Sequence, residues 1–181
     1  MNLYEPFAME NRHKGPDTIK CHRLLDSDKT FYTCGRPGYL KTNKTRQVSE
    51  GEVSQWVLSL PGPGTVIISL LGRKPDGKSE FRFYPFHGNW DSVEERRDKP
   101  SFQEWLDRHH SDMSLSVIEH PTVDQGIETE KAKMIAAEVV RLTSLGRTVV
   151  VVDSAGVSRT GKVAKVLRTW SEVVHATAPS E

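Results

Sequence analysis

Residues 148–161 read TVVVVDSAGVSRTG. The β-branched run through Val152 predicts a buried strand, because four or more consecutive apolar residues of this type fit a sheet interior. Small residues follow at 154–158 and predict a tight loop, and the residues from Arg159 onward predict a helix. Backbone N–H groups in such a loop at a helix N-terminus point inward and bind anions, with help from the helix dipole. The stretch therefore predicts a cradle for a phosphoryl group.

The candidate binding residues of this cradle lie between the strand and the helix. Their small side chains let the backbone curl closely around a phosphoryl group. Arg159 can add a planar, bidentate clamp on two phosphoryl oxygens. The residues expected to bind substrate are Ser154, Ala155, Gly156, Val157, Ser158 and Arg159.

The stretch from Asp153 to Gly161 resembles the signature of the cysteine-dependent protein tyrosine and dual-specificity phosphatases. That signature is a Cys, five residues, an Arg, then commonly Thr or Ser and Gly. This chain has Asp153 at the position of the nucleophilic Cys, and Val152 at that of the His that commonly precedes it. The resemblance implies that Arg159 binds the phosphoryl group and that Thr160 assists the leaving nucleophile in the second step.

A nucleotide-binding loop is the rival interpretation of the same residues. Gly156, four residues and then Gly161-Lys162 match all but the last letter of the Gly-x-x-x-x-Gly-Lys-Ser/Thr pattern. Val163 takes that last position and has no hydroxyl group for Mg²⁺. The short chain segment that follows leaves little room for the later strands of such a sheet.

A phosphatase of the resembled type also needs a general acid that protonates the leaving oxygen. The family supplies it from an Asp on a loop upstream of the nucleophile, and residues 124–127, Asp-Gln-Gly-Ile, resemble that loop. The Trp-Pro that usually precedes the Asp is Thr122-Val123 here. We therefore expect Asp124 to be the acid. Asp91, which follows Trp90, is the second candidate.

Composition and charge narrow the class of protein. The chain has 181 residues and a formal net charge of +1, which favours one domain and gives no argument for nucleic acid or membrane binding. Its two cysteines, Cys21 and Cys34, give no disulfide framework and favour a cytoplasmic location. No apolar run approaches the ~20 residues of a membrane span. No Cys and His cluster has zinc spacing, and no metal or cofactor is expected.

Alternating strand and helix patterns predict an α/β fold. The expected strands are 30–33, 65–71, 80–86, 115–119 and 148–152, and the expected helices are 49–58, 101–110, 129–145 and 160–176. In the helix at 129–145 the candidate core residues are Met134, Ile135, Ala137, Val139 and Leu142. The resemblance implies a central, mostly parallel sheet flanked by helices. We expect an irregular extension at 1–28, the phosphatase-like domain at 29–176 and a loose tail at 177–181.

The functional hypotheses differ in how they explain an Asp, rather than a Cys, at position 153. A carboxylate there accepts the N–H bonds of the cradle itself and repels phosphate. We favour a phosphoprotein phosphatase, of tyrosine or dual-specificity type, in which Asp was placed at the Cys position by design and stops hydrolysis. The alternative is a natural pseudophosphatase that binds a phosphorylated partner without hydrolysis. A phosphatase acting on inositol phosphates or RNA 5′-phosphates stays open. Lys41, Lys44 and Arg46 form a basic patch, for which an ordinary solvated surface is the default interpretation and guidance of an acidic or phosphorylated partner is the alternative.

Overall fold

The β-branched run of residues 149–153 lies at the centre of the sheet. The structure, a computed structural model, describes residues 19–24, 28–124 and 126–176. Its five-stranded sheet has the order β1-β2-β5-β3-β4, and β5 (Val149–Asp153) is buried along its whole length. β2 (Thr30–Gly35) and β3 (Val66–Ser69) pair with β5 in parallel on either side, and β4 (Ser116–Glu119) pairs in parallel with β3. The prediction of a mostly parallel sheet flanked by helices is confirmed.

The sheet also has an antiparallel edge strand that the sequence analysis missed. β1 (Lys20–Arg23) pairs antiparallel with β2, inside the segment that we expected to be irregular. Its four residues are polar or small, and each is exposed or half-buried, so no apolar alternation marks it as a strand. The expected tail at 177–181 and residues 1–18 of the expected extension lie outside the described residues.

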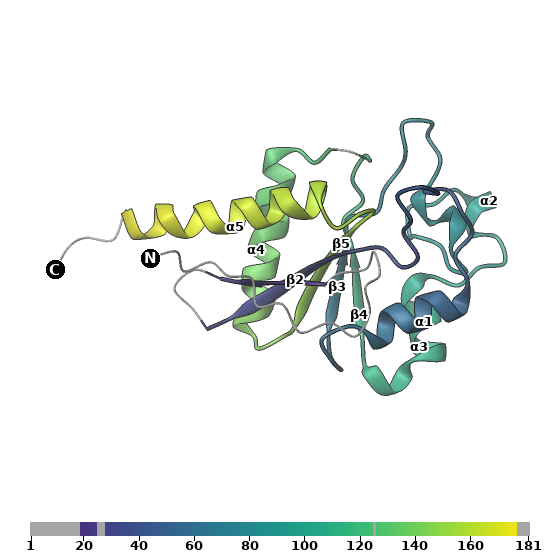
Figure 1. Cartoon of the computed structure of the whole chain (residues 1–181), viewed down its shortest axis with the longest axis horizontal. Coiled ribbons are helices and arrows are strands. Elements are labelled where there is room, and N and C mark those ends of the chain that lie inside the picture. The colour runs from purple at the N-terminus through teal and green to yellow at the C-terminus, as the bar shows by residue number, and fades with distance from the viewer. Residues whose placement is uncertain (1–18, 25–27, 125, 177–181) are drawn as a thin grey trace.

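Side chains of the central strands alternate between two cores, as the pleat of a strand requires. Val149 and Val151 face the core under α4 (Thr129–Ser144) and α5 (Ser158–Ala176). Val150 and Val152 face the second core, beneath α1 (Glu50–Leu58) and α3 (Phe102–His109). Figure 1 shows α4 and α5 together on one side of the sheet and α1 and α3 together at the other. The sheet is therefore the middle layer of three.

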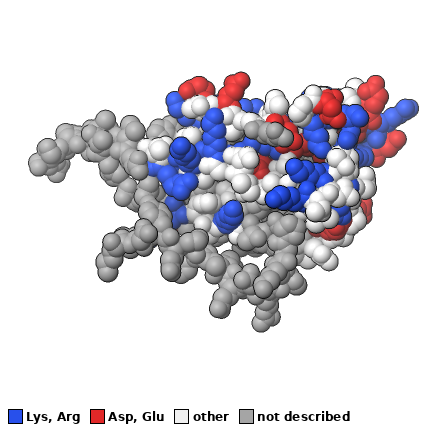
Figure 2. Space-filling model, turned by 45° about the horizontal axis from the view of Figure 1, so that its top comes forward, with Lys and Arg blue, Asp and Glu red and all other residues white. Residues whose placement is uncertain are grey.

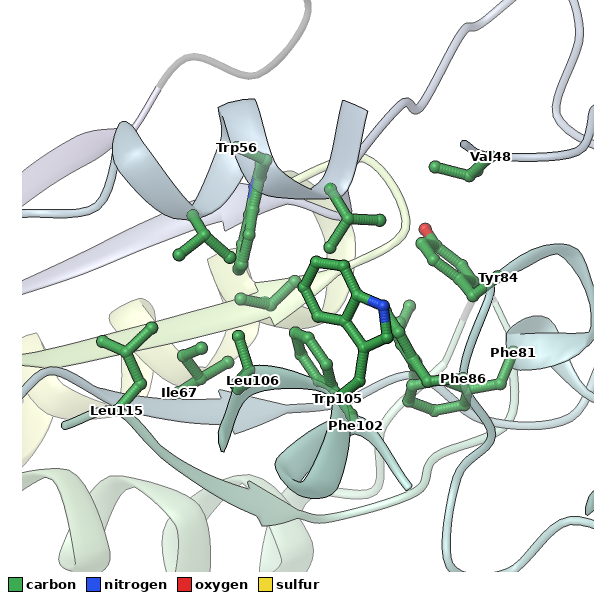
Figure 3. Close-up of a cluster of buried hydrophobic side chains, with 14 of the residues drawn as sticks. Val48, Trp56, Ile67, Phe81, Tyr84, Phe86, Phe102, Trp105, Leu106 and Leu115 are labelled. Atoms are coloured by element: carbon green, nitrogen blue, oxygen red, sulfur yellow. The ribbon is translucent and has the colours of Figure 1, made fainter. Parts of the chain in front are cut away.

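Aromatic residues dominate the core beneath α1 and α3. Trp105 of α3 is 1% exposed and lies among Phe86, Phe102 and Trp56 (Figure 3). Phe86 stacks on Phe102 with 4.1 Å between the ring centroids. This packing fixes the segment between β3 and α3, which carries residues of the site described below.

Capping boxes begin three of the helices. Ser49 with Glu52 starts α1 and Ser101 with Glu104 starts α3, which are helices predicted above, and Ser92 with Glu95 starts the short helix α2 (Val93–Arg96). In each box the serine side chain accepts a backbone N–H and the glutamate accepts the N–H of the cap residue, so two open donors are satisfied.

Two predictions from local pattern were wrong. Residues 80–86, expected to be a strand, begin with the 3₁₀ helix η1 (Glu80–Phe83), in which the Ser79 side chain accepts the N–H of Phe81. In α4 the expected core residue Met134 is 52% exposed and Ala137 is also exposed, whereas Ala132 and Ala136 are buried beside Ile135. A second 3₁₀ helix, η2 (Ser111–Met113), links α3 to β4.

Within the described part of the chain, no helix combines the length and the apolar character that crossing a membrane requires.

Candidate functional site

The cradle joins the end of β5 to the start of α5. Gly156 has a φ of +69°, and a Cβ atom there would lie 2.6 Å from Gly35 N and 2.7 Å from Cys34 C. Only glycine accepts both this conformation and this approach of the backbone. The N–H of Arg36 donates to the carbonyl of Asp153 at 2.8 Å, which ties the start of the loop to the end of β2. The loop is thus held against the end of β2 at both Asp153 and Gly156.

The carboxylate of Asp153 accepts the inward N–H groups of this loop. Oδ1 accepts the N–H of Ala155 at 3.0 Å and the N–H of Gly156. Oδ2 accepts the N–H of Thr160 at 3.0 Å and its hydroxyl at 3.3 Å. The residue is only 2% exposed. The negative charge therefore lies at a helix N-terminus, where backbone donors and the helix dipole stabilise an anion.

Arg159 lies buried against the cradle and is 2% exposed. Its Nη1 donates to Glu80 Oε2 and to the carbonyl of Leu70, each at 2.9 Å. Its Nη2 donates to Ser154 Oγ at 2.6 Å and to Glu80 Oε1 at 3.1 Å. The guanidinium is thus fixed by a bidentate carboxylate, an arrangement that a planar fork of donors favours.

Glu80 is a site residue that the sequence analysis did not identify. It is 2% exposed, and besides Arg159 it accepts the N–H of Gly72 at 2.6 Å and the hydroxyl of Ser154. The 3₁₀ turn that begins at Glu80 directs this carboxylate into the protein. A Glu that opens a predicted strand carries no local signal of such a role.

The loop after β4 brings Asp124 to the cradle. Asp124 N donates to the carbonyl of Arg73 at 3.0 Å, and its Oδ1 lies 3.6 Å from Arg159 Nη2. Gly72 permits this arrangement, because a Cβ atom there would overlap the backbone of Thr122. The side chain of Asp124 is 26% exposed, so it reaches both the guanidinium and water. Gln125, which follows it in the expected acid loop, lies outside the described residues.

Asp91, the second candidate acid, lies elsewhere. It is 4% exposed and its Oδ2 accepts the N–H of Gly88 at 2.9 Å. Burial raises the pKa of this carboxyl group. Asp91 does not line the pocket over the cradle, whereas Asp124 does.

A pocket with a volume of about 130 Å³ opens over the cradle. Six of the expected site residues line it, whereas Thr160 is buried and neither Gly156 nor Val157 belongs to the lining. The loop after β2 adds Arg36, Tyr39 and Lys44 to the lining, and the loop after β3 adds Lys74. The six expected residues are Asp124, Asp153, Ser154, Ala155, Ser158 and Arg159, and Glu80 completes the wall.

The structure also bears on the nucleotide-loop interpretation and on the basic patch. Lys162, which the nucleotide-loop interpretation would place on phosphates, instead donates from Nζ to the carbonyl of Ile127 at 2.6 Å and does not line the pocket. Of the basic patch, Lys44 lines the pocket and Arg46 forms an ion pair with Glu52. Among the described residues, no three His, Cys, Asp or Glu side chains are arranged to hold a metal ion.

Comparisons with known proteins identify the fold of the chain but not its family. No family model and no curated protein matches the chain. Among solved structures, the chain is similar to a kinase-associated phosphatase whose catalytic-site cysteine was replaced by serine. The two share 14% sequence identity with a TM-score of 0.56, over 88% of this chain and 78% of the other. This likeness shows that the chain has a phosphatase-like α/β fold.

Proposed function

We propose that this chain carries the site of a phosphoprotein phosphatase, of tyrosine or dual-specificity type, in which Asp153 takes the place of the nucleophile and prevents hydrolysis. The observation that carries the proposal is the position of the Asp153 carboxylate. It accepts the N–H groups of Ala155, Gly156 and Thr160, the donors that a phosphoryl group would otherwise use.

The same donors suit a cysteine at position 153. A thiolate placed there gains the N–H groups and the helix dipole, both of which lower the pKa of a thiol. It then attacks phosphorus while Asp124 protonates the leaving oxygen. The hydroxyl of Thr160 lies 3.3 Å from Asp153 Oδ2, so it can donate to a thiolate at this position when water releases the phosphoryl group.

Asp153 itself supports no such turnover. Its carboxylate fills the anion position, and its charge opposes the entry of a second anion. The buried Arg159 offers limited compensation, because its Nη1 and Nη2 already donate to Glu80. The protein with Asp153 is therefore expected to be inactive toward phosphomonoesters.

A natural pseudophosphatase is the second candidate, and one observation favours it. Three backbone N–H groups and one hydroxyl donate to the Asp153 carboxylate, so both of its oxygens have hydrogen-bond donors. The codon for residue 153 in the natural gene separates the two: a Cys codon means a designed substitution, and an Asp codon means a natural pseudophosphatase. Phosphoprotein, inositol phosphate and RNA 5′-phosphate substrates all share the phosphomonoester that the cradle is proposed to hold.

The test is hydrolysis of 4-nitrophenyl phosphate by the unaltered chain and by Asp153→Cys. We expect turnover only in the Cys variant, with inhibition by orthovanadate and by thiol alkylation. Adding Asp124→Asn should slow hydrolysis most for phosphate esters with poor leaving groups, whereas adding Asp91→Asn should leave the rate unchanged. A folded Asp153→Cys protein without turnover would overturn the proposal.

A further inference from the structure

Arg36 is a buried cation with neutral partners. It is 3% exposed and lines the pocket over the cradle. Its Nη1 donates to Tyr84 Oη at 2.8 Å and its Nη2 donates to the carbonyl of Lys44 at 2.7 Å. The guanidinium carbon also lies 5.5 Å from the ring centroids of both Tyr39 and Tyr84. These contacts orient the guanidinium, and none of them is to a carboxylate.

Two lysines also line this pocket. Lys74 is half-buried, with Nζ 5.0 Å from the centroid of the Phe83 ring, and Lys44 is exposed. Burial lowers the pKa of Lys74, and the nearby charges of Arg36 and Arg82 lower it further, against a smaller opposite effect of Glu80 and Asp124. Figure 2 shows several Lys and Arg side chains beside one another on one face of the molecule.

Two of the other buried or half-buried arginines have a carboxylate partner, whereas half-buried Arg82 forms no ion pair among the described residues. Arg159 is paired with Glu80, and Arg46 is paired with Glu52. Among the described residues, no carboxylate forms an ion pair with Arg36, Lys44 or Lys74. Charged groups taken out of water are normally paired, because an uncompensated charge loses hydration without any return. A buried and oriented cation in a pocket wall is therefore a site prepared for an anion.

We infer that Arg36, Lys44 and Lys74 form a second anion subsite beside the cradle, so that the pocket takes a ligand with two anionic groups, of which one is the phosphoryl group in the cradle. This inference rests on the proposed function, because it takes the cradle as the first phosphoryl site. The second group is a phosphoryl or carboxylate group on the same ligand, as in a bisphosphate or in a phosphopeptide with a neighbouring acidic side chain.

The positions of the charged side chains around the pocket favour a second anion subsite on the loops over a single, larger phosphate cradle. The three carboxylates of the pocket lie at Glu80, Asp124 and Asp153, and the first two lie next to Arg159. The remaining cations come from the loops after β2 and β3. The three cations therefore share one pocket with the cradle, and Glu80 and Asp124 act on Lys74 through space without forming an ion pair with it.

The experiment uses Asp153→Ser, which empties the cradle of its carboxylate and supplies no catalytic thiol. Binding of inorganic phosphate and of pyrophosphate is measured by titration calorimetry at low salt. We expect pyrophosphate to bind at least tenfold more tightly than phosphate, because only pyrophosphate reaches both subsites. Lys74→Met or Lys44→Met in this background should weaken pyrophosphate binding about tenfold, as expected for one charge-assisted hydrogen bond. Phosphate binding should change less than threefold.

Matched controls come from the same loops. Lys78→Met and Lys41→Met remove exposed lysines that do not line the pocket, and neither should change the ratio of the two affinities. The inference is wrong if pyrophosphate binds no more tightly than phosphate, or if the control variants lower the ratio equally. Neither result bears on the proposed function, because turnover by Asp153→Cys tests that function separately. A phosphopeptide with Asp or Asn beside its phosphoresidue, compared with a small bisphosphate, then identifies the source of the second anion.

Discussion

Replacing Glu80 with Gln takes the charged partner away from a guanidinium that has almost no access to water. Both side chains of the Glu80 and Arg159 pair are 2% exposed, and two hydrogen bonds, of 2.9 and 3.1 Å, join them. Removing one partner of a buried pair typically costs about 3–5 kcal/mol, because the other charge is left uncompensated. Gln keeps one oxygen that can accept from Arg159, so we expect about 3 kcal/mol.

The magnitude is large for a protein of this size. A domain is typically stable by about 5–15 kcal/mol, so the variant should fold but unfold at lower temperature. For a chain of 150–250 residues, each kcal/mol shifts Tm by about 2–4 °C, which gives a decrease of about 6–12 °C. Urea titration and thermal unfolding followed by circular dichroism would measure it. Glu94→Gln, at an exposed position of α2, is the matched control and should change Tm little.

A double-mutant cycle assigns the effect to the pair. Arg159→Met combined with Glu80→Gln should be less destabilised than the sum of the two single variants, by about 2 kcal/mol or more, because the second change removes the charge that the first left unpaired. A loss below about 1 kcal/mol for Glu80→Gln, or strict additivity in the cycle, would refute the reasoning.

Three further predictions address other parts of the structure. Gly156→Ala forces a side chain onto a φ of +69° and against Gly35 N. In urea titrations it should lower the free energy of unfolding by about 1–3 kcal/mol, and in the Asp153→Cys background it should abolish turnover. A variant as stable as the unaltered chain would contradict this. The hydrogen bond from Arg46 lowers the pKa of Glu52 from 4.5 to about 2, so its stabilisation is complete above pH 4.5 and disappears as the pH falls toward 2. Glu52→Gln should therefore lower Tm at pH 7 and lose this difference near pH 2, and a constant difference would show that the pair is not its cause. Trp105→Ala should cost about 3–5 kcal/mol of unfolding free energy, because the side chain is 1% exposed; a loss below 1 kcal/mol would contradict its place in the core.

The sequence predicted the centre of the fold because the signals there are local. The run of β-branched residues marks β5, and the capping boxes at Ser49 and Ser101 mark the starts of α1 and α3. Each of these features stabilises its own segment, so no distant partner is needed to recognise it. The position of the cradle between β5 and α5 followed from the same local pattern.

The rest of the site depends on contacts between distant segments. Glu80 enters the protein because its carboxylate pairs with Arg159, and this contact overrides the strand-like pattern of residues 80–86. Arg36 and Lys74 reach the pocket from two loops that no sequence spacing connects. The strand β1 was missed because its pairing with β2, rather than its own composition, defines it.

The position of the Asp153 carboxylate is tested most directly by phosphate binding. Titration calorimetry would compare inorganic phosphate binding to the unaltered chain and to Asp153→Ser, at one pH and one salt concentration. The carboxylate already accepts the N–H groups of Ala155, Gly156 and Thr160, so we predict at least tenfold tighter phosphate binding to the Ser variant. Equal affinity of the two proteins would contradict the claim that Asp153 occupies the phosphoryl position.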